Sequence, residues 1–522
     1  MKKILLMMVA LVATVSISAQ DDEGWSKSFA PVSDKTELGG LHTAVAGDGS
    51  VYASSTYNQA FTFAGKAVTD PEGLTSSCVV KYDKDGAEQW AISLVGKCTI
   101  YAMTADADGT LYVAGKTEDT KIIVTGTDGA QKEIVNAMSD PWGIGEFSID
   151  SYAAFVIKIS NSGVVEALKT IAPETNAEVA SSEFPFYLPD SEFPIDITPS
   201  KIAIDGNKVF VSATYYGDVK DGDNLIWEGS YAADMDFGMY FDNRSRGVLM
   251  LNKSDLSGMA NVAYVKATGV PEVQVYPQAL DFVMYNGVPY IAFIGFGNLT
   301  LTTPKGSKDF TFEMLGEGNN EHALVLANAT EPTKAKVFNA APNDYLGAAY
   351  GLVDAAIAGE NCILAGTFYG QFPLDSSVKK DVNTSFVASI KMADCSVNWA
   401  KANGVESKAV CMVVAGEEIV ASTEKITYTF KTASGDLKES KTMDKGFADA
   451  SVYNDQYCST ISVDEANVII FSPKLKPSNV KAAQDVQNGA VKVYTLEGIE
   501  RPALQKGLNL IKTAEGTQKV LK

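Results

Sequence analysis

The sequence predicts an all-β protein, and within that class a β-propeller of six to seven four-stranded blades. Two observations carry this prediction. A hairpin pattern recurs along the 522 residues, and a second two-strand pattern follows many of its copies. The copies are irregularly spaced, which suits a propeller with large inserts better than a solenoid, whose repeats stack at a fixed pitch.

The clearest hairpin covers residues 98–117, CTIYAMTADADGTLYVAGKT. Its turn contains Asp106 and Asp108, whose side chains suit turn backbone, and ends in Gly109, which is free to adopt a positive φ. The strand that follows is rich in residues with high β propensity. Weaker copies have their turns at residues 47–49, 205–207, 286–287, 359–361, 416–417 and 464–467.

The second pattern is an apolar strand, a polar turn and a strand that often contains tryptophan. Its clearest copies are residues 78–92, with Trp90, and residues 385–400, with Trp399. A hairpin followed by this unit makes four strands, the number in a propeller blade. We expect the tryptophans at this position to pack in the core or between blades.

An isolated strand at residues 24–30, with Trp25, matches the last strand of a blade but has no blade before it. The last blade lacks that strand, because residues 448–453 run almost directly into residues 458–472. We therefore predict that the N-terminal strand completes the final blade and closes the ring, which removes exposed strand edges.

The first 19 residues have the layout of a secretory signal peptide. Lys2 and Lys3 precede an apolar run over residues 4–15 and small residues up to Ala19, after which we expect cleavage. No later stretch approaches about 20 uninterrupted apolar residues, so we expect no transmembrane segment after leader removal. The sequence thus predicts an exported protein.

Two stretches carry a resemblance to known families. Residues 106–115 and 155–160 resemble the repeats of secreted bacterial β-propellers, with a DxxGN-like turn, a VYVAG-like strand and an FVxKxD-like strand. Residues 491–522 resemble short C-terminal tails of secreted Bacteroidetes proteins, whose VYxLxG, KGxxxI and KVLxK segments are related to type IX secretion sorting domains. The resemblance implies a propeller at the cell surface, in the outer membrane or outside the cell, and implies no shared activity.

These observations divide the chain into four parts. We expect a signal peptide at residues 1–19, a β-propeller at 20–472, a linker at 473–490 and a C-terminal β tail at 491–522, the last a three-strand meander.

Composition excludes several classes of function. The formal net charge of -21 repels nucleic acid and anionic membrane surfaces. The 6 cysteines form no CxxC pair, so any disulfides would be local, with a connectivity that the sequence leaves open. The 2 histidines argue against a His-rich zinc site.

The inserts at residues 133–149, 171–199 and 218–246 are where we expect a ligand site, because loops on a rigid scaffold usually carry binding residues. Their aromatic side chains could stack on sugar rings. The alternative is that they pack the inserts onto the propeller wall. The candidate ligand-binding residues are Trp142, Tyr187, Trp227 and Tyr231.

A metal site is a further hypothesis for the third insert. Asp218, Asp221 and Asp223 are closely spaced carboxylates of the kind that bind calcium, although the DxDxDG pattern is incomplete and turn chemistry is the alternative. We expect no other cofactor.

Catalytic motifs such as GxSxG, a Walker loop or HExxH are absent from the sequence. Arg244 and Arg246 lie near the acidic residues Asp234, Asp236 and Asp242, and we expect these charges to be solvated or ion-paired. The sequence therefore favours a non-catalytic binding protein for a glycan or a protein. The alternatives are an enzyme with its site in the central funnel and a structural surface component.

Overall fold

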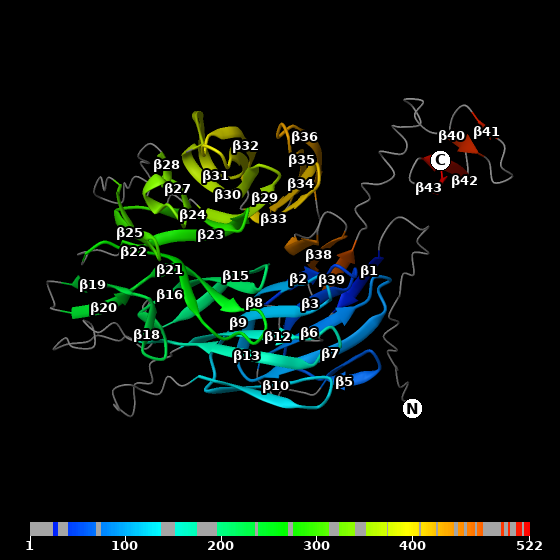
Figure 1. Ribbon diagram of the computed structural model, residues 1–522, viewed down its shortest axis with the longest axis horizontal. Helices are drawn as coiled ribbons and strands as arrows, with labels where there is room; N and C mark the ends of the chain where they lie inside the picture. The colour runs from blue at the N-terminus through cyan, green and yellow to red at the C-terminus, as the bar shows by residue number, and fades with distance from the viewer. Residues whose placement is uncertain are drawn as a thin grey trace, which may run out of the picture.

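The structure is a computed structural model of the chain (Figure 1). The predicted signal peptide and linker lie outside the residues that it describes. The described residues are 25–29, 40–68, 75–136, 152–174, 196–234, 239–269, 275–312, 323–339, 351–372, 374–406, 409–423, 426–442, 447–453, 457–464, 467–472, 492–494, 500–501, 508–513 and 516–521.

Over the described residues, seven antiparallel sheets each contain a four-stranded blade. Six blades run from their inner to their outer strand in chain order. Blade 1 contains β2 (His42–Val45), β3 (Val51–Tyr57), β6 (Ser76–Tyr82) and β7 (Glu88–Val95); blade 2 contains β8 (Cys98–Ala105), β9 (Leu111–Thr117), β12 (Ala153–Ile159) and β13 (Val165–Ile171); blade 3 contains β15 (Ile197–Asp205), β16 (Lys208–Tyr215), β21 (Ser245–Asn252) and β22 (Ala260–Ala267).

The remaining blades follow the same order. Blade 4 contains β23 (Pro277–Tyr285), β24 (Val288–Gly295), β27 (Ala323–Asn328) and β28 (Lys336–Asn339); blade 5 contains β29 (Gly351–Ala358), β30 (Asn361–Phe372), β31 (Asp375–Lys391) and β32 (Val397–Glu406); blade 6 contains β33 (Ala409–Ala415), β34 (Glu418–Thr423), β35 (Ile426–Lys431) and β36 (Leu437–Thr442); blade 7 contains β37 (Phe447–Tyr453), β38 (Tyr457–Asp464), β39 (Asn467–Ser472) and β1 (Trp25–Phe29).

The seven inner strands form a ring. Each contacts the next in the order β2, β8, β15, β23, β29, β33 and β37, and β37 contacts β2. In blade 7 the outer position belongs to β1, which pairs with β39 from Trp25 opposite Ser472 to Phe29 opposite Val468. The chain thus folds as a seven-bladed β-propeller, the larger of the two blade numbers that the sequence predicts.

The hydrophobic core lies between adjacent blades. Ile92 of blade 1 and Phe155 of blade 2 share one buried cluster, and Val156 of blade 2 and Leu249 of blade 3 share the next. Ile461 of blade 7 is buried in the cluster of blade 1. Each such side chain contributes about 1.5–3 kcal/mol on burial, so every blade is stabilised by its neighbours.

Three tryptophans on outer strands join one blade to the next. In each case the indole Nε1–H donates to a carbonyl oxygen in the turn between the third and fourth strands of the following blade, and a glycine of that turn lies against the ring. The donors and acceptors are Trp25 to Lys84 at 3.2 Å, Trp90 to Asn161 at 3.0 Å and Trp399 to Thr432 at 3.1 Å, with Gly86, Gly163 and Gly435 against the rings. The predicted inter-blade role of these tryptophans is confirmed.

Most inserts connect the second strand of a blade to its third. They therefore leave the blades at the edge where the inner strands begin. Two hairpins, β10–β11 and β25–β26, extend the sheets of blades 1 and 3. The insert strands are β4 (Phe61–Phe63), β5 (Lys66–Val68), β10 (Lys121–Thr125), β11 (Gln131–Val135), β14 (Pro173–Glu174), β17 (Asp218–Asp221), β18 (Asn224–Trp227), β19 (Ser230–Asp234), β20 (Met239–Asn243), β25 (Asn298–Thr303) and β26 (Gly306–Thr311).

The C-terminal tail forms a separate small sheet with the strand order β41-β40-β42-β43. Its strands are β40 (Lys492–Tyr494), β41 (Glu500–Arg501), β42 (Leu508–Thr513) and β43 (Gly516–Leu521). The predicted meander is therefore present with one additional short strand. A short 3-10 helix, η1 (Pro332–Lys334), lies in the last turn of blade 4.

Two observations bear on the predictions from composition. The described part of the chain contains no helix with the length and hydropathy needed to cross a membrane. The cysteines whose side chains are described, Cys78, Cys98, Cys362, Cys395 and Cys411, are all free. Disulfides among these five therefore do not fasten the blades.

Candidate binding site in the central cavity

A β-bulge occurs at the same level in six of the seven inner strands. Each bulge leaves one residue of the inner strand without a partner in the second strand, which bends the strand and redirects its side chains. The six residues without a partner are Tyr101, Ser200, Gln278, Val353, Val410 and Ala448. All six line one cavity.

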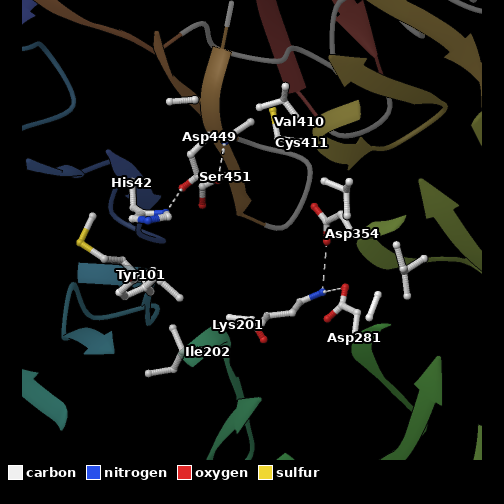
Figure 2. A pocket seen from close by; sticks show the side chains of 18 of the residues that line it. His42, Tyr101, Lys201, Ile202, Asp281, Asp354, Val410, Cys411, Asp449 and Ser451 are labelled. Atoms are coloured by element: carbon white, nitrogen blue, oxygen red, sulfur yellow. Dashed lines mark hydrogen bonds and ion pairs between the residues drawn. The ribbon is translucent and has the colours of Figure 1, made fainter. Parts of the chain in front are cut away.

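This cavity has a volume of about 500 Å³ and lies where the inner strands begin. It is therefore on the edge of the propeller from which the long inserts emerge. Side chains from all seven inner strands line it, and Figure 2 shows charged groups pointing into it from several sides. A cavity of this size is within the range of small-ligand sites.

A lysine and two carboxylates from three successive blades meet in the cavity (Figure 2). Lys201 of β15 places its Nζ 2.9 Å from Oδ2 of Asp281 of β23 and 3.2 Å from Oδ1 of Asp354 of β29. The same Nζ donates to the carbonyl oxygen of Ala355 at 2.7 Å. The lysine and Asp354 are each about a quarter exposed, at 26% and 27%, whereas Asp281 is 8% exposed.

The surroundings shift the pKa values of this cluster. Burial raises the pKa of Asp354 to about 6, because the loss of hydration disfavours the charged carboxylate. Lys201 partly opposes this shift, and repulsion by Asp281 adds a smaller contribution to it. Burial alone would lower the pKa of Lys201, but the two carboxylates outweigh it and the pKa is raised. Lys201 therefore remains charged, and Asp354 titrates close to neutral pH.

A second polar group lies across the cavity. Nδ1 of His42, in blade 1, is 3.4 Å from Oδ2 of Asp449, in blade 7. The same carboxylate oxygen accepts the backbone N–H of Thr43 at 2.9 Å, and the other oxygen accepts that of Ala450. Asp449 is thus fixed by backbone donors and links blade 7 to blade 1.

The structure places the predicted stacking residues in different environments. Trp142 and Tyr187 lie outside the described residues. Trp227 is fully buried, stacked on Tyr215 with ring centroids 4.8 Å apart, and its ring packs against Gly247, where a Cβ would lie 2.5 Å from it. This environment fits the alternative interpretation, in which the aromatic residues pack the inserts onto the propeller wall. Tyr231 is half-buried on β19.

The three predicted calcium ligands do not converge. Asp218 accepts the backbone N–H of Gly229 at 2.8 Å, and Asp221 is paired with Lys169 at 2.7 Å, while Asp223 is exposed in the turn between β17 and β18. Among the described residues no group of three or more His, Cys, Asp or Glu side chains is arranged to hold a metal ion. Two of the three carboxylates of this calcium hypothesis therefore have partners within the protein.

The residues that line the cavity were not among the predicted site residues. The signal that could have indicated them is a charge inside an otherwise apolar inner strand, as with Lys201 before Ile202 and Asp354 before Ala355. Arg244 and Arg246 were expected to be solvated or ion-paired, and no ion pair joins either of them to a side chain that the structure describes. Arg246 lines the cavity, and its Nε–H donates to the carbonyl oxygen of Pro277 at 3.0 Å.

The sheets and the ring define a β-propeller with a polar central cavity. Neither a protein-family model nor a curated protein matches the chain. Similar solved structures include BamB from Moraxella catarrhalis, with 10% identity over 80% of this chain and 98% of that chain at a TM-score of 0.34.

Two further similar structures are eukaryotic. One is the β-propeller domain of Cps50 (Swd1) from Myceliophteria thermophila, with 8% identity over 85% of this chain and 99% of that chain at a TM-score of 0.37. The other is Sqt1 from Saccharomyces cerevisiae, with 8% identity over 87% of this chain and 99% of that chain at a TM-score of 0.40. At these identities and TM-scores the likeness bears on neither the ligand nor the activity of this chain.

Proposed function

We propose that the protein is a non-catalytic, secreted or cell-surface binding protein whose ligand is a glycan or a protein. The observation that carries this proposal is the position of the central cavity at the edge from which the long inserts leave the blades. A ligand at this face would contact the cavity and the inserts together, with the blades as a rigid support. Export is supported by the leader pattern of residues 1–19 and the tail pattern of residues 491–522.

Binding is favoured over catalysis by the state of the charged groups. Lys201 is engaged by two carboxylates and a carbonyl oxygen, and Asp449 by two backbone N–H groups and His42. Groups held in this way suit the recognition of polar ligand atoms.

A glycan array probed with residues 20–522 tests the proposal. We expect at least one glycan class to bind, and substitution of Trp142 or Tyr187 by Ala to weaken that signal if the inserts contribute. Lys334→Ala is the matched control, because Lys334 is 71% exposed in a turn at the opposite edge. If neither glycans nor proteins from the cell envelope bind, the binding proposal is refuted and a structural role takes its place.

An enzyme with its site in the funnel is the second candidate, and the raised pKa of Asp354 is the observation that favours it. A carboxyl group that titrates near neutral pH can transfer a proton in a reaction. Hydrolysis of a bound glycan, abolished by Asp354→Asn while binding is retained, would establish this alternative. Binding without product formation, measured by mass spectrometry of the glycan, would exclude it.

A further inference from the structure

We propose that Arg244 and Arg246 form a binding site for the anionic group of an acidic glycan, either a carboxylate or a sulfate, at the central cavity. This inference rests on the proposed function and names the class of its ligand. It is based on the rarity of arginine in this chain, on the contacts of the two guanidinium groups and on the polar lining beside them.

Arginine is scarce in this protein. The sequence contains three arginines, Arg244, Arg246 and Arg501, and its other basic residues are lysines. The two arginines of the propeller are two residues apart, with Arg244 directly before β21 of blade 3 and Arg246 at its second position. A guanidinium presents paired N–H donors that match both oxygens of a carboxylate or sulfate, which an ammonium cannot do.

The contacts of both arginines leave those paired donors available. Nε–H of Arg244 donates to the Tyr216 hydroxyl at 2.8 Å, and its guanidinium carbon lies 4.6 Å from the ring centroid of Tyr276. Nε–H of Arg246 donates to Pro277. Within the described residues, the Nη atoms of neither arginine make a hydrogen bond, so the aromatic rings and the carbonyl group orient the two side chains without saturating them.

Neither guanidinium has a carboxylate partner among the side chains that the structure describes. Of the Asp and Glu residues whose side chains are described, none lies within 4.0 Å of Arg244 or Arg246, although the protein has a net charge of -21. The nearby cations of blades 2 and 3 differ in this respect, because Lys116 is paired with Asp196 at 2.8 Å and Lys201 is paired twice. An anion at the arginines would supply the missing negative charge.

The two guanidinium groups also repel one another. The pKa of Arg246 is lowered to about 10. Burial is the main cause of this shift, and the positive charge of Arg244 is the second. Arg246 therefore remains charged at neutral pH. A bound anion would therefore relieve the repulsion and the loss of hydration together, and should bind more tightly than at an isolated surface arginine.

The lining beside Arg246 favours a saccharide as the carrier of the anion. Ser200, Gln278 and Asp281 offer donors and acceptors for hydroxyl groups, and the half-buried ring of Tyr101 offers an apolar face. The cavity volume of about 500 Å³ suits a small polar ligand or the end of a glycan chain. A folded protein surface could reach these groups only through a projecting acidic side chain.

The test uses paired acidic and neutral forms of the same sugar: sialyllactose with lactose, and oligogalacturonate with its methyl ester. We measure binding of residues 20–522 by titration calorimetry at low and physiological salt. We expect at least one acidic form to bind about tenfold or more tightly than its neutral partner. Arg246→Gln and Arg244→Gln should each remove most of that preference, and Arg246→Lys should restore only part of it because the paired donors are lost.

Thermal unfolding of each variant shows whether it is folded, and Arg244→Gln keeps the test available if Arg246→Gln fails to fold. Lys334→Gln removes an exposed positive charge at the opposite edge and should leave both affinities unchanged. Equal binding of acidic and neutral forms would overturn the arginine site while leaving the binding proposal intact. Binding of an acidic peptide with no glycan bound would overturn the choice of saccharide. Absence of any binding would overturn both proposals.

Discussion

The ion cluster of the cavity can be tested by replacing its cation with an uncharged side chain of similar shape. Lys201→Met leaves Asp281, which is 8% exposed, and Asp354 close together with no neutralising charge. Removing one partner of a buried ion pair costs about 3–5 kcal/mol. Because Lys201 and Asp354 are about a quarter exposed to the cavity, we expect the lower end, about 3 kcal/mol, at pH 7.5.

The loss of stability caused by Lys201→Met should depend on pH. Without Lys201, the pKa of Asp354 rises further above its unfolded value, so the folded state binds more protons than the unfolded state near pH 5. The loss of stability is therefore fully present above this raised pKa and shrinks as the pH falls through it. Urea unfolding of wild type and variant at pH 7.5 and pH 5, followed by tryptophan fluorescence, measures both effects.

The matched control is Lys334→Met, which breaks the pair of Lys334 with Glu331 in which both side chains are at least half exposed. It should cost less than about 0.5 kcal/mol at either pH. If Lys201→Met proves as harmless as this control, water in the cavity screens the cluster and the reasoning is wrong. A loss of equal size at both pH values would contradict the assigned titration of Asp354.

Three further predictions concern packing and the cavity. Trp399→Ala should destabilise the fold by about 3–5 kcal/mol. Trp399→Phe should destabilise it by about 1 kcal/mol, because the hydrogen bond to Thr432 is lost. The urea midpoints of the two variants check both values, and equal losses would contradict the role of the indole N–H. Trp227→Phe should lower the thermal midpoint yet leave ligand affinity of the folded protein unchanged, because the ring is buried; a selective loss of affinity would contradict this. Since the pKa of Asp354 is about 6, lowering the pH from 7.5 to 5 neutralises it and should strengthen binding of acidic sugars several-fold. Asp354→Asn should show the stronger binding already at pH 7.5, and a pH effect of unchanged size in this variant would contradict the role of Asp354.

The blades could be predicted because their signals are local. Each hairpin turn needs a residue that tolerates positive φ, such as Gly109, and each strand needs residues that suit a pleated sheet. The inter-blade tryptophans were also predictable, because Trp90 and Trp399 occupy the same place in the repeat. These features require only neighbours in the sequence.

The cavity could not be predicted in the same way. Tyr101 and Val410 read as ordinary strand residues, and only their pairing partners reveal the bulges that turn them toward the cavity. Lys201, Asp281 and Asp354 belong to three blades and meet only when the ring is complete. Trp227 was predicted as a ligand-binding residue but is buried, because Gly247 leaves space for its ring. The sequence does not reveal this contact.

The pairing of β1 with β39 has a consequence for the order of folding. These strands join residues about 440 positions apart, and closing an unfolded loop of that length costs about 5 kcal/mol in chain entropy by the logarithmic relation. Most of that cost disappears if blades 1 to 6 form first, because the folded blades then hold the two ends close together. Blade 7 should therefore assemble last, and hydrogen exchange should find its amides opening before those of other blades. Until then β1 and β39 have unpaired edges, which makes the late folding intermediate the species most prone to associate with other chains.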